Sequence, residues 1–349
     1  MLNLYDYDIK KLEELMLLDE QKKYRATQLF VWLYDKKAKS FDEMSDISIK
    51  YREVLKGKYC LTLPKIDVRQ DSSDGTIKLL LELEDGNKVE SVLMRYNYGN
   101  AICVSSQVGC DMGCSFCSSG LLGKVRNLEP HEMVGQVLIM NELLKEEGND
   151  ERVTHIVVMG TGEPFNNYDN VMTFIRIVNA QKGLAIGARH ITVSTCGIID
   201  GIKKYAHEGL QTNLAISLHA PNNELRNRLM KINKAYPLEE LIDAVKYYEE
   251  VAGRRVTYEY LLLANINDSL EHAKELVKLI KDTKGYVNLI PYNETKLCDY
   301  KRSSNNRVHA FLDYLTRAGI TSTIRKEFGS DIDAACGQLR AKEALLNED

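Results

Sequence analysis

The sequence predicts an α/β protein whose main domain is a sheet of parallel strands, either an incomplete barrel or a doubly wound sheet. Three observations support this fold class. From residue 101 onward, short apolar runs typical of buried strands alternate with amphipathic segments of helical spacing. Six such strand–helix units in series favour parallel pairing, because right-handed crossovers return each strand to the same sheet. The length of 349 residues also fits about two domains or one barrel.

The segment before these units shows two other patterns. Residues 1–62 carry apolar side chains at helical spacing, as at Leu29 and Leu33, so we expect a small helical domain there. Residues 63–98 change to the alternation that is typical of strands, with a hairpin turn at Asp85-Gly86-Asn87. We therefore expect a β-hairpin extension that leads into the main domain.

The elements of the main domain follow in order. Strands are expected at residues 101–106, 155–159, 190–194, 213–218, 256–263 and 286–291. The clearest helices are expected at residues 129–147, 169–181, 238–251, 269–283 and 305–318. A further strand is expected at 321–325. The predicted division of the chain is 1–62 (helical domain), 63–98 (hairpin extension), 99–293 (βα core) and 294–349 (C-terminal segment).

Composition excludes several classes of protein. A net charge of −4 argues against a protein that coats nucleic acid non-specifically, which needs a broad basic face. The N-terminus is charged throughout and has no signal-peptide block, and no stretch approaches the ~18 uncharged apolar residues of a membrane span. We therefore expect a cytoplasmic protein. In that reducing compartment, its eight cysteines indicate metal binding or catalysis rather than structural disulfides.

Three of these cysteines lie together after the first predicted strand of the main domain. Cys110, Cys114 and Cys117 form a C-x-x-x-C-x-x-C run. A structural zinc site is one alternative, but it almost always needs four protein ligands, and no fourth lies close in sequence. Three thiolates on a short loop fit a [4Fe–4S] cluster better, with one iron left open for a small molecule.

Polar and glycine residues gather at the predicted carboxyl ends of the strands. Gly162 and Glu163 follow the second strand, and Ser194 ends the third. The run Ser217–His219 ends the fourth strand, and Asn293 follows the sixth. A strand-end serine is most often a turn or cap, and a lone histidine is more often packed than a ligand. Because ligand sites of parallel sheets gather at this edge, the common location favours a binding site.

The cysteine run resembles a known superfamily. C-x-x-x-C-x-x-C after a first barrel strand, with Phe116 before the last cysteine, is similar to the radical S-adenosylmethionine superfamily. The resemblance implies a partial (βα)6 barrel and a [4Fe–4S] cluster held by Cys110, Cys114 and Cys117. It also implies that S-adenosylmethionine binds the open iron and is cleaved to a 5′-deoxyadenosyl radical.

A closer resemblance covers residues from about 20 to 345. The chain is similar to the adenine-C2 methyltransferases of 23S ribosomal RNA and tRNA, and its matching stretches are VESVLMRY, CVSSQVGC, CSFC, MGTGEPFNNYDN, RHITVSTCGI, NLAISLHAPNNELR, VTYEYLL, NDSLEHA, VNLIPYN and SDIDAACGQLRAKE. The resemblance implies that Cys336 carries the methyl group, that Cys103 resolves the covalent intermediate and that Glu90 accepts a proton. It implies that S-adenosylmethionine is bound by Gly162, Glu163, Ser194, Ser217, Leu218, His219 and Asn293.

In the route that this family uses, the Cys336 thiolate first takes a methyl group from one S-adenosylmethionine. The radical from a second S-adenosylmethionine removes hydrogen from that methyl, and the methylene radical adds to adenine C2. Glu90 then removes the C2 proton. Cys103 attacks the Cys336 sulfur, which releases the base and leaves a transient disulfide.

The resemblance also implies partners. These are 23S rRNA and tRNA as substrates and an electron donor such as flavodoxin or ferredoxin. The resemblance further implies that the protein is a monomer and does not bind a membrane. Basic residues that could contact RNA occur in small sets, each of which is more often an ordinary solvated surface: Arg25, Lys36, Lys37, Lys39, Lys124, Arg126, Lys301, Arg302, Arg307, Arg325 and Lys326.

Three alternatives stay open. A close relative of the family methylates adenine C8 and confers antibiotic resistance. Phe328 is reminiscent of that relative, whereas Pro164, Pro291 and the GQLRAKE ending favour C2. An activating enzyme that makes a glycyl radical on a partner protein would not need Cys103 and Cys336. A zinc-stabilised RNA-binding module without catalysis is the alternative from another class.

Overall fold

One mixed sheet of ten strands organises the part of the chain that the computed structural model describes, residues 1–120, 123–148, 151–295, 298–333 and 339. Seven neighbouring strands run parallel, in the order β14 (Ser322–Ile324), β13 (Tyr286–Pro291), β12 (Thr257–Leu262), β11 (Asn213–Ser217), β10 (Ile191–Thr195), β9 (Val153–Val158) and β6 (Gly99–Cys103). The α/β class and the predicted strands of the main domain are confirmed.

The same sheet continues beyond β6 with antiparallel strands. These are β5 (Lys88–Tyr96), β4 (Ile77–Glu82) and β3 (Lys65–Asp71). The predicted hairpin therefore does more than lead into the main domain, because β5 pairs along β6 with Val92 opposite Cys103. Only two residues separate β5 from β6, and so short a connection keeps consecutive strands adjacent.

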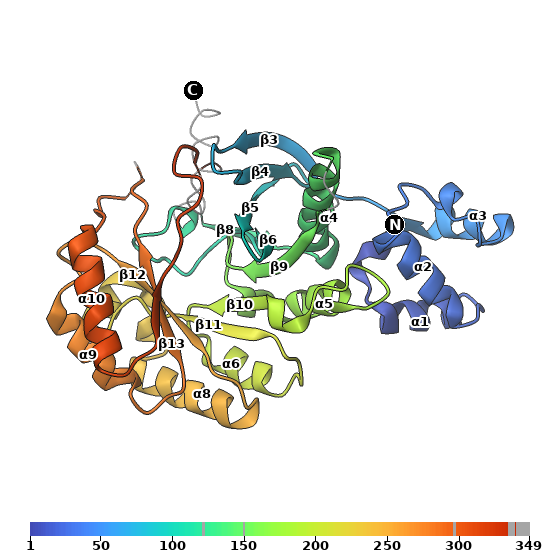
Figure 1. Cartoon of the computed structure of the whole chain (residues 1–349). Helices are drawn as coiled ribbons and strands as arrows, with labels where there is room; N and C mark the ends of the chain where they lie inside the picture. Colours follow the sequence, from blue (N-terminus) through green and yellow to red (C-terminus); the bar gives the residue numbers. More distant parts are fainter. Residues whose placement is uncertain (121–122, 149–150, 296–297, 334–338, 340–349) are drawn as a thin grey trace.

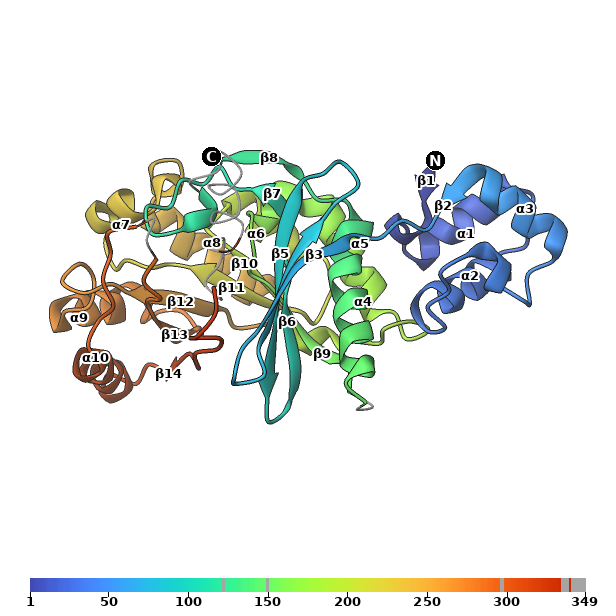
Figure 2. The ribbon, with the colours of Figure 1, turned by 90° about the horizontal axis from the view of Figure 1, so that it is seen from above.

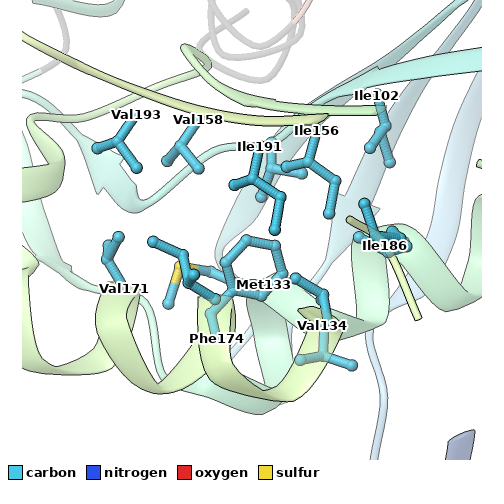
Figure 3. Packing of buried hydrophobic residues seen from close by; sticks show 14 of the residues in the cluster. Ile102, Met133, Val134, Ile156, Val158, Val171, Phe174, Ile186, Ile191 and Val193 are labelled. Carbon is cyan, nitrogen blue, oxygen red and sulfur yellow. The ribbon is translucent and has the colours of Figure 1, made fainter. Parts of the chain in front are cut away.

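Helices cover the outer face of the parallel strands (Figure 1). They are α4 (Pro130–Glu146), α5 (Tyr168–Asn179), α6 (Ile199–Ala206), α8 (Leu238–Val251), α9 (Leu270–Ile280) and α10 (Asn305–Arg317). The short helix α7 (Asn223–Leu229) lies instead at the carboxyl ends of the strands. Figure 3 shows Ile156 and Ile191 of the sheet facing Phe174 of α5 and Val134 of α4 in one buried cluster. The five helices that the sequence predicted most clearly are confirmed. Among the described residues, no helix is long and apolar enough to cross a bilayer.

The N-terminal residues form a small helical unit. It contains α1 (Ile9–Leu18), α2 (Tyr24–Tyr34) and α3 (Ile49–Lys58), with β1 (Leu2–Asn3) parallel to β2 (Tyr59–Cys60). Figure 2 shows the unit to one side of the sheet, next to α4 and α5. One contact joins Asp6 to α4, where the Asp6 carboxylate accepts a hydrogen bond from the backbone N–H of His131 at 2.9 Å.

Candidate active site

A cavity of about 370 Å³ opens at the carboxyl ends of the parallel strands, a size that suits a cofactor or small substrate. Most residues that the sequence singled out line it: Glu90, Cys103, Cys110, Cys114, Cys117, Gly162, Glu163, Ser194, Ser217, His219 and Asn293. Leu218 is fully buried and does not line the cavity. Cys336 lies outside the described residues. The sheet thus gathers side chains from positions 90 to 293, although their individual roles stay predictions.

The cysteine loop connects two short strands, β7 (Gln107–Gly109) and β8 (Lys124–Asn127). They pair antiparallel and form a small ribbon that the sequence did not predict. Charged residues alternate in β8, which weakens its strand pattern. The backbone N–H of Cys110 donates to the carbonyl of Gly123 at 3.1 Å. A Cβ at Gly109 would lie 1.7 Å from that carbonyl oxygen, and the residue has a φ of +76°. Only glycine therefore allows so close an approach at the start of the loop.

The three cysteines of the loop are half-buried at the cavity, close enough for their charges to interact. Burial raises the pKa of the Cys110 thiol to about 11, and burial also raises the pKa of Cys114 and of Cys117. A charge on Cys117 raises the pKa of Cys114 further, so a bound cation is needed to keep these groups ionised together. No group of three or more His, Cys, Asp or Glu side chains in the described part is placed to hold one metal ion. Three cysteine thiols on one loop form the kind of donor set that holds an iron–sulfur cluster and leaves one iron without a protein ligand.

Glu163 lies on the loop after β9 and is held by backbone groups. Its two carboxylate oxygens accept from the backbone N–H of Cys196 at 2.7 Å and of Phe165 at 2.9 Å. Burial raises the pKa of Glu163, and these hydrogen bonds oppose that rise. Each oxygen has a second lone pair, so the carboxylate can still accept from an ammonium group. Gly162, with a φ of +114°, leaves no room for a side chain, since a Cβ would lie 2.6 Å from Gln107.

The ends of β10 and β11 bring two serines and a histidine to the cavity. The Ser194 and Ser217 hydroxyls are 3.4 Å apart. His219 Nδ1 accepts from the backbone N–H of Leu261 at 3.1 Å, which leaves Nε2 as the donor of a neutral ring. Burial lowers the pKa of His219 to about 3, with a further contribution from the charge of Arg226. His219 therefore remains neutral at physiological pH.

Arg226, which the sequence did not single out, supports these strand ends from α7. Its guanidinium is fully buried and donates to the carbonyls of Cys196 at 2.7 Å and of Leu218 at 3.2 Å. It also donates to the Asn233 amide oxygen at 2.9 Å. Burial lowers the pKa of Arg226 to about 10, so the group keeps its charge at neutral pH. Helix α7 has only seven residues, too few for the sequence to mark which charged position is buried.

Glu90 and Cys103 face the cavity from neighbouring antiparallel strands β5 and β6. The Glu90 carboxylate pairs with the Lys78 ammonium at 3.0 Å, and both side chains are almost wholly buried. Burial raises the pKa of Cys103, while the charges of Arg325 and Lys78 oppose that rise. The sequence reasoning missed Lys78, although a lysine inside the apolar run of β4 was an available signal.

The remaining cysteines and the basic residues differ in whether they lie at the cavity. Cys196 lines the cavity, and Cys298 lies close enough to Cys117 for its charge to raise the pKa of that thiol. Of the basic residues expected to contact RNA, only Arg325 and Lys326 line the cavity within the described part of the chain.

Comparisons with known proteins agree over most of the chain. Residues 104–280 match the family described as "Radical SAM superfamily", and residues 2–61 match the "Ribosomal RNA large subunit methyltransferase N-terminal domain". A protein of Streptococcus equi subsp. zooepidemicus named "Probable dual-specificity RNA methyltransferase RlmN" is 52% identical over 92% of this chain and 90% of its own length. A protein of the same name from Geobacillus thermodenitrificans is 53% identical over 98% and 93% of the two chains.

A solved structure shows the same fold. The crystal structure of a radical SAM methyltransferase from Sphaerobacter thermophilus superposes with a TM-score of 0.91 and 43% identity. The match covers 98% of this chain and 100% of the other.

Proposed function

Because the chain belongs to the family of dual-specificity RNA methyltransferases within the radical SAM superfamily, we propose that it methylates C2 of an adenine in 23S rRNA and in tRNA. One observation supports this reaction most directly. Glu90 and Cys103 line the same cavity as Cys110, Cys114 and Cys117, so a carboxylate and a thiol are available beside the cofactor position. The family is one of RNA methyltransferases, which replaces the alternatives of a glycyl-radical activating enzyme and of a zinc-stabilised binding module.

The residues proposed to bind the cofactors lie at the ends of the parallel strands and on the loops that follow them. Cys110, Cys114 and Cys117 would hold a [4Fe–4S] cluster with one open iron. When bound, the cluster supplies the electron that cleaves S-adenosylmethionine to a 5′-deoxyadenosyl radical, and two molecules of S-adenosylmethionine are used per turnover. Leaving one iron without a protein ligand reserves it for that cosubstrate.

The strand-end residues would bind S-adenosylmethionine by ordinary polar contacts. The Glu163 carboxylate accepts from the methionine ammonium, and Gly162 lines the same part of the cavity with its backbone. The Ser194 and Ser217 hydroxyls, 3.4 Å apart, suit the paired hydroxyls of a ribose. His219 Nε2–H is a neutral donor, Leu218 contributes through its backbone, and Asn293 contributes an amide.

The RNA side of the reaction belongs to three residues. Cys336 would carry the methyl group, a role that comes from its DIDAACGQL motif. Glu90 would take the C2 proton. Cys103 would then attack the Cys336 sulfur, so that an S–S bond forms as the bond between that sulfur and the methylene carbon breaks; the carbon keeps the electron pair and its bond to the base, and takes a proton to become the methyl group. The Lys78 ammonium, 3.0 Å from the Glu90 carboxylate, holds that carboxylate in place at the cavity.

The substrate adenine has to leave its stack to reach this cavity, either by base flipping or from an RNA loop. Arg325 and Lys326 are cations at the cavity that suit the RNA backbone. The proposal includes a monomer that acts in the cytoplasm with a flavodoxin or ferredoxin as electron donor.

The proposal is tested by mass spectrometry of nucleosides. Purified protein, reconstituted anaerobically with iron and sulfide, is incubated with reductant, S-adenosylmethionine and either 23S rRNA or tRNA lacking the modification. We expect 2-methyladenosine from both RNAs. 8-Methyladenosine would instead establish the C8 alternative, and unmodified adenosine from a brown, iron-loaded protein would contradict both.

A further inference from the structure

Lys78 occupies an unusual position for a lysine. It is the second residue of β4, and its side chain is fully buried, which is rare for this residue type unless the charge is paired. Strand alternation places it on the same face as Glu90, one diagonal step away on β5. Its ammonium pairs with the Glu90 carboxylate at 3.0 Å.

The same ammonium has a second partner far along the chain. It donates to the backbone carbonyl of Asp333 at 2.5 Å. Asp333 precedes Cys336 by three residues in the sequence. One buried cation therefore contacts both the proposed proton acceptor and the segment that leads to the proposed methyl carrier.

The segment 329–333 is held against the β3–β4 hairpin by further contacts. The Gln70 amide and Asp333 exchange two hydrogen bonds, at 3.0 Å and 3.1 Å. The Asp331 carboxylate accepts from the backbone N–H of Ser73 at 3.0 Å. The Asp74 carboxylate accepts from the backbone N–H of Gly329 at 2.9 Å. These contacts hold the segment without Lys78, so Lys78 is not its sole attachment.

Stability alone is a weak explanation for this arrangement. Burying an ion pair costs desolvation that the attraction often only balances, and apolar replacements of such pairs are frequently neutral. The pair instead serves to orient its members, because an ammonium has three N–H donors and holds each acceptor in a fixed position around it.

We propose that Lys78 is a positioning residue that couples Glu90 to the segment 329–333, which ends three residues before Cys336, so that one group holds both the proton acceptor and the chain that leads to the methyl carrier. The inference rests on the proposed function for the roles of Glu90 and Cys336. It adds a residue that touches neither the cofactor nor the base, and it gives the antiparallel hairpin a part in the reaction.

A double-mutant cycle with Lys78→Met and Glu90→Gln tests the proposal. Lys78→Met should lower RNA turnover about 100-fold, as expected when a reacting group is misplaced by about 1 Å. Because Glu90 would act after the base is attached, the variant should also accumulate a covalent protein–RNA adduct, detected by intact mass. Combined with Glu90→Gln, Lys78→Met should add little further loss, because both changes remove the same function.

Two further variants keep the test interpretable. Lys78→Arg retains the cation and should recover a large part of the turnover. Lys88→Met removes a partly exposed lysine at the start of β5, paired with Asp67 of β3, and should leave turnover unchanged. If Lys78→Met leaves an unpaired carboxylate that unfolds the protein, the double variant removes both charges and is compared with Glu90→Gln alone.

The results of these experiments can contradict the role of Lys78 without contradicting the proposed methyltransferase function. Full turnover by Lys78→Met, or losses that multiply in the double variant, would overturn the role of Lys78 while wild-type protein still makes 2-methyladenosine. Absence of 2-methyladenosine from the wild-type reaction would overturn the proposed function itself.

Discussion

The parallel and antiparallel halves of the sheet differ in where they carry chemistry. In the parallel half, from β6 to β13, the candidate residues end the strands or follow them: Ser217 ends β11, whereas Cys110 and Glu163 lie on loops. In the antiparallel half, Glu90 and Lys78 lie inside strands β5 and β4. Loops at strand ends suit the binding of a mobile cofactor, whereas a strand interior holds a reacting carboxylate rigidly. We infer that the parallel half prepares the radical and the antiparallel half works on the base.

The strongest test of this division is to remove a cluster ligand from the parallel half. Cys114→Ser should abolish iron binding, methylation of Cys336 and methylation of RNA together, because each depends on the same cofactor position. Iron content, intact mass and nucleoside analysis measure the three. Cys60→Ser, in the N-terminal helical unit, is the matched control and should keep all three activities. A Cys114→Ser protein that still methylates RNA would contradict the assignment of the cluster.

A change in the antiparallel half should spare the first step. Glu90→Gln should bind iron and methylate Cys336 normally, yet lose about 10²–10⁴-fold in RNA turnover, the usual contribution of a positioned base. The base should remain attached to the protein, which denaturing electrophoresis with labelled RNA detects. Cys103→Ala should trap the same adduct, because Cys103 would act after Glu90. Normal release of methylated RNA by either variant would remove that residue from the reaction.

The two halves also differed in how far the sequence could predict them. Strand and helix positions in the parallel half followed from apolar spacing, and Glu163 and Ser194 followed from the rule that ligands gather at strand ends. Glu90 lies inside an antiparallel strand, where no such rule applies, so only the family motifs singled it out. Cys103 ends the parallel strand β6, but a lone cysteine is more often a small packed residue, so the family motifs were needed for it as well. The apolar run of β4 could have marked Lys78 as a buried charge, but its partner, the Asp333 carbonyl, is 255 residues away, and no local pattern reports that contact.

Arg226 tests how strongly the parallel half depends on its supports. Arg226→Met keeps much of the side-chain volume but leaves the carbonyls of Cys196 and Leu218 without their buried donor. Unsatisfied buried acceptors of this kind should cost about 3 kcal/mol in the free energy of unfolding. Because Ser217 and His219 flank Leu218, the apparent affinity for S-adenosylmethionine should fall while the Glu90-dependent steps are unchanged. Urea unfolding and equilibrium binding of S-adenosylhomocysteine measure the two effects. Unchanged binding in a destabilised protein would limit Arg226 to a structural role.

The smallest effect is expected where the N-terminal helical unit meets the parallel half, at the pair between Asp6 and His131. Burial of the ring lowers the pKa of His131, but the hydrogen bond and charge of Asp6 outweigh it, so the net pKa is raised above 6.5. A raised histidine pKa stabilises docking fully below pH 6.5, and the contribution is lost as pH rises through the folded-state value. Limited proteolysis of the connection at residues 61–64 should therefore become faster as pH rises above 6.5, for a loss of at most about 1 kcal/mol. His131→Gln retains a side-chain amide but does not titrate, so its cleavage rate, corrected for the protease's own pH dependence, should stay constant. If wild type and His131→Gln share one pH profile, the docking of this unit depends on its apolar contacts instead, and the third region is joined to the sheet without a titrating group.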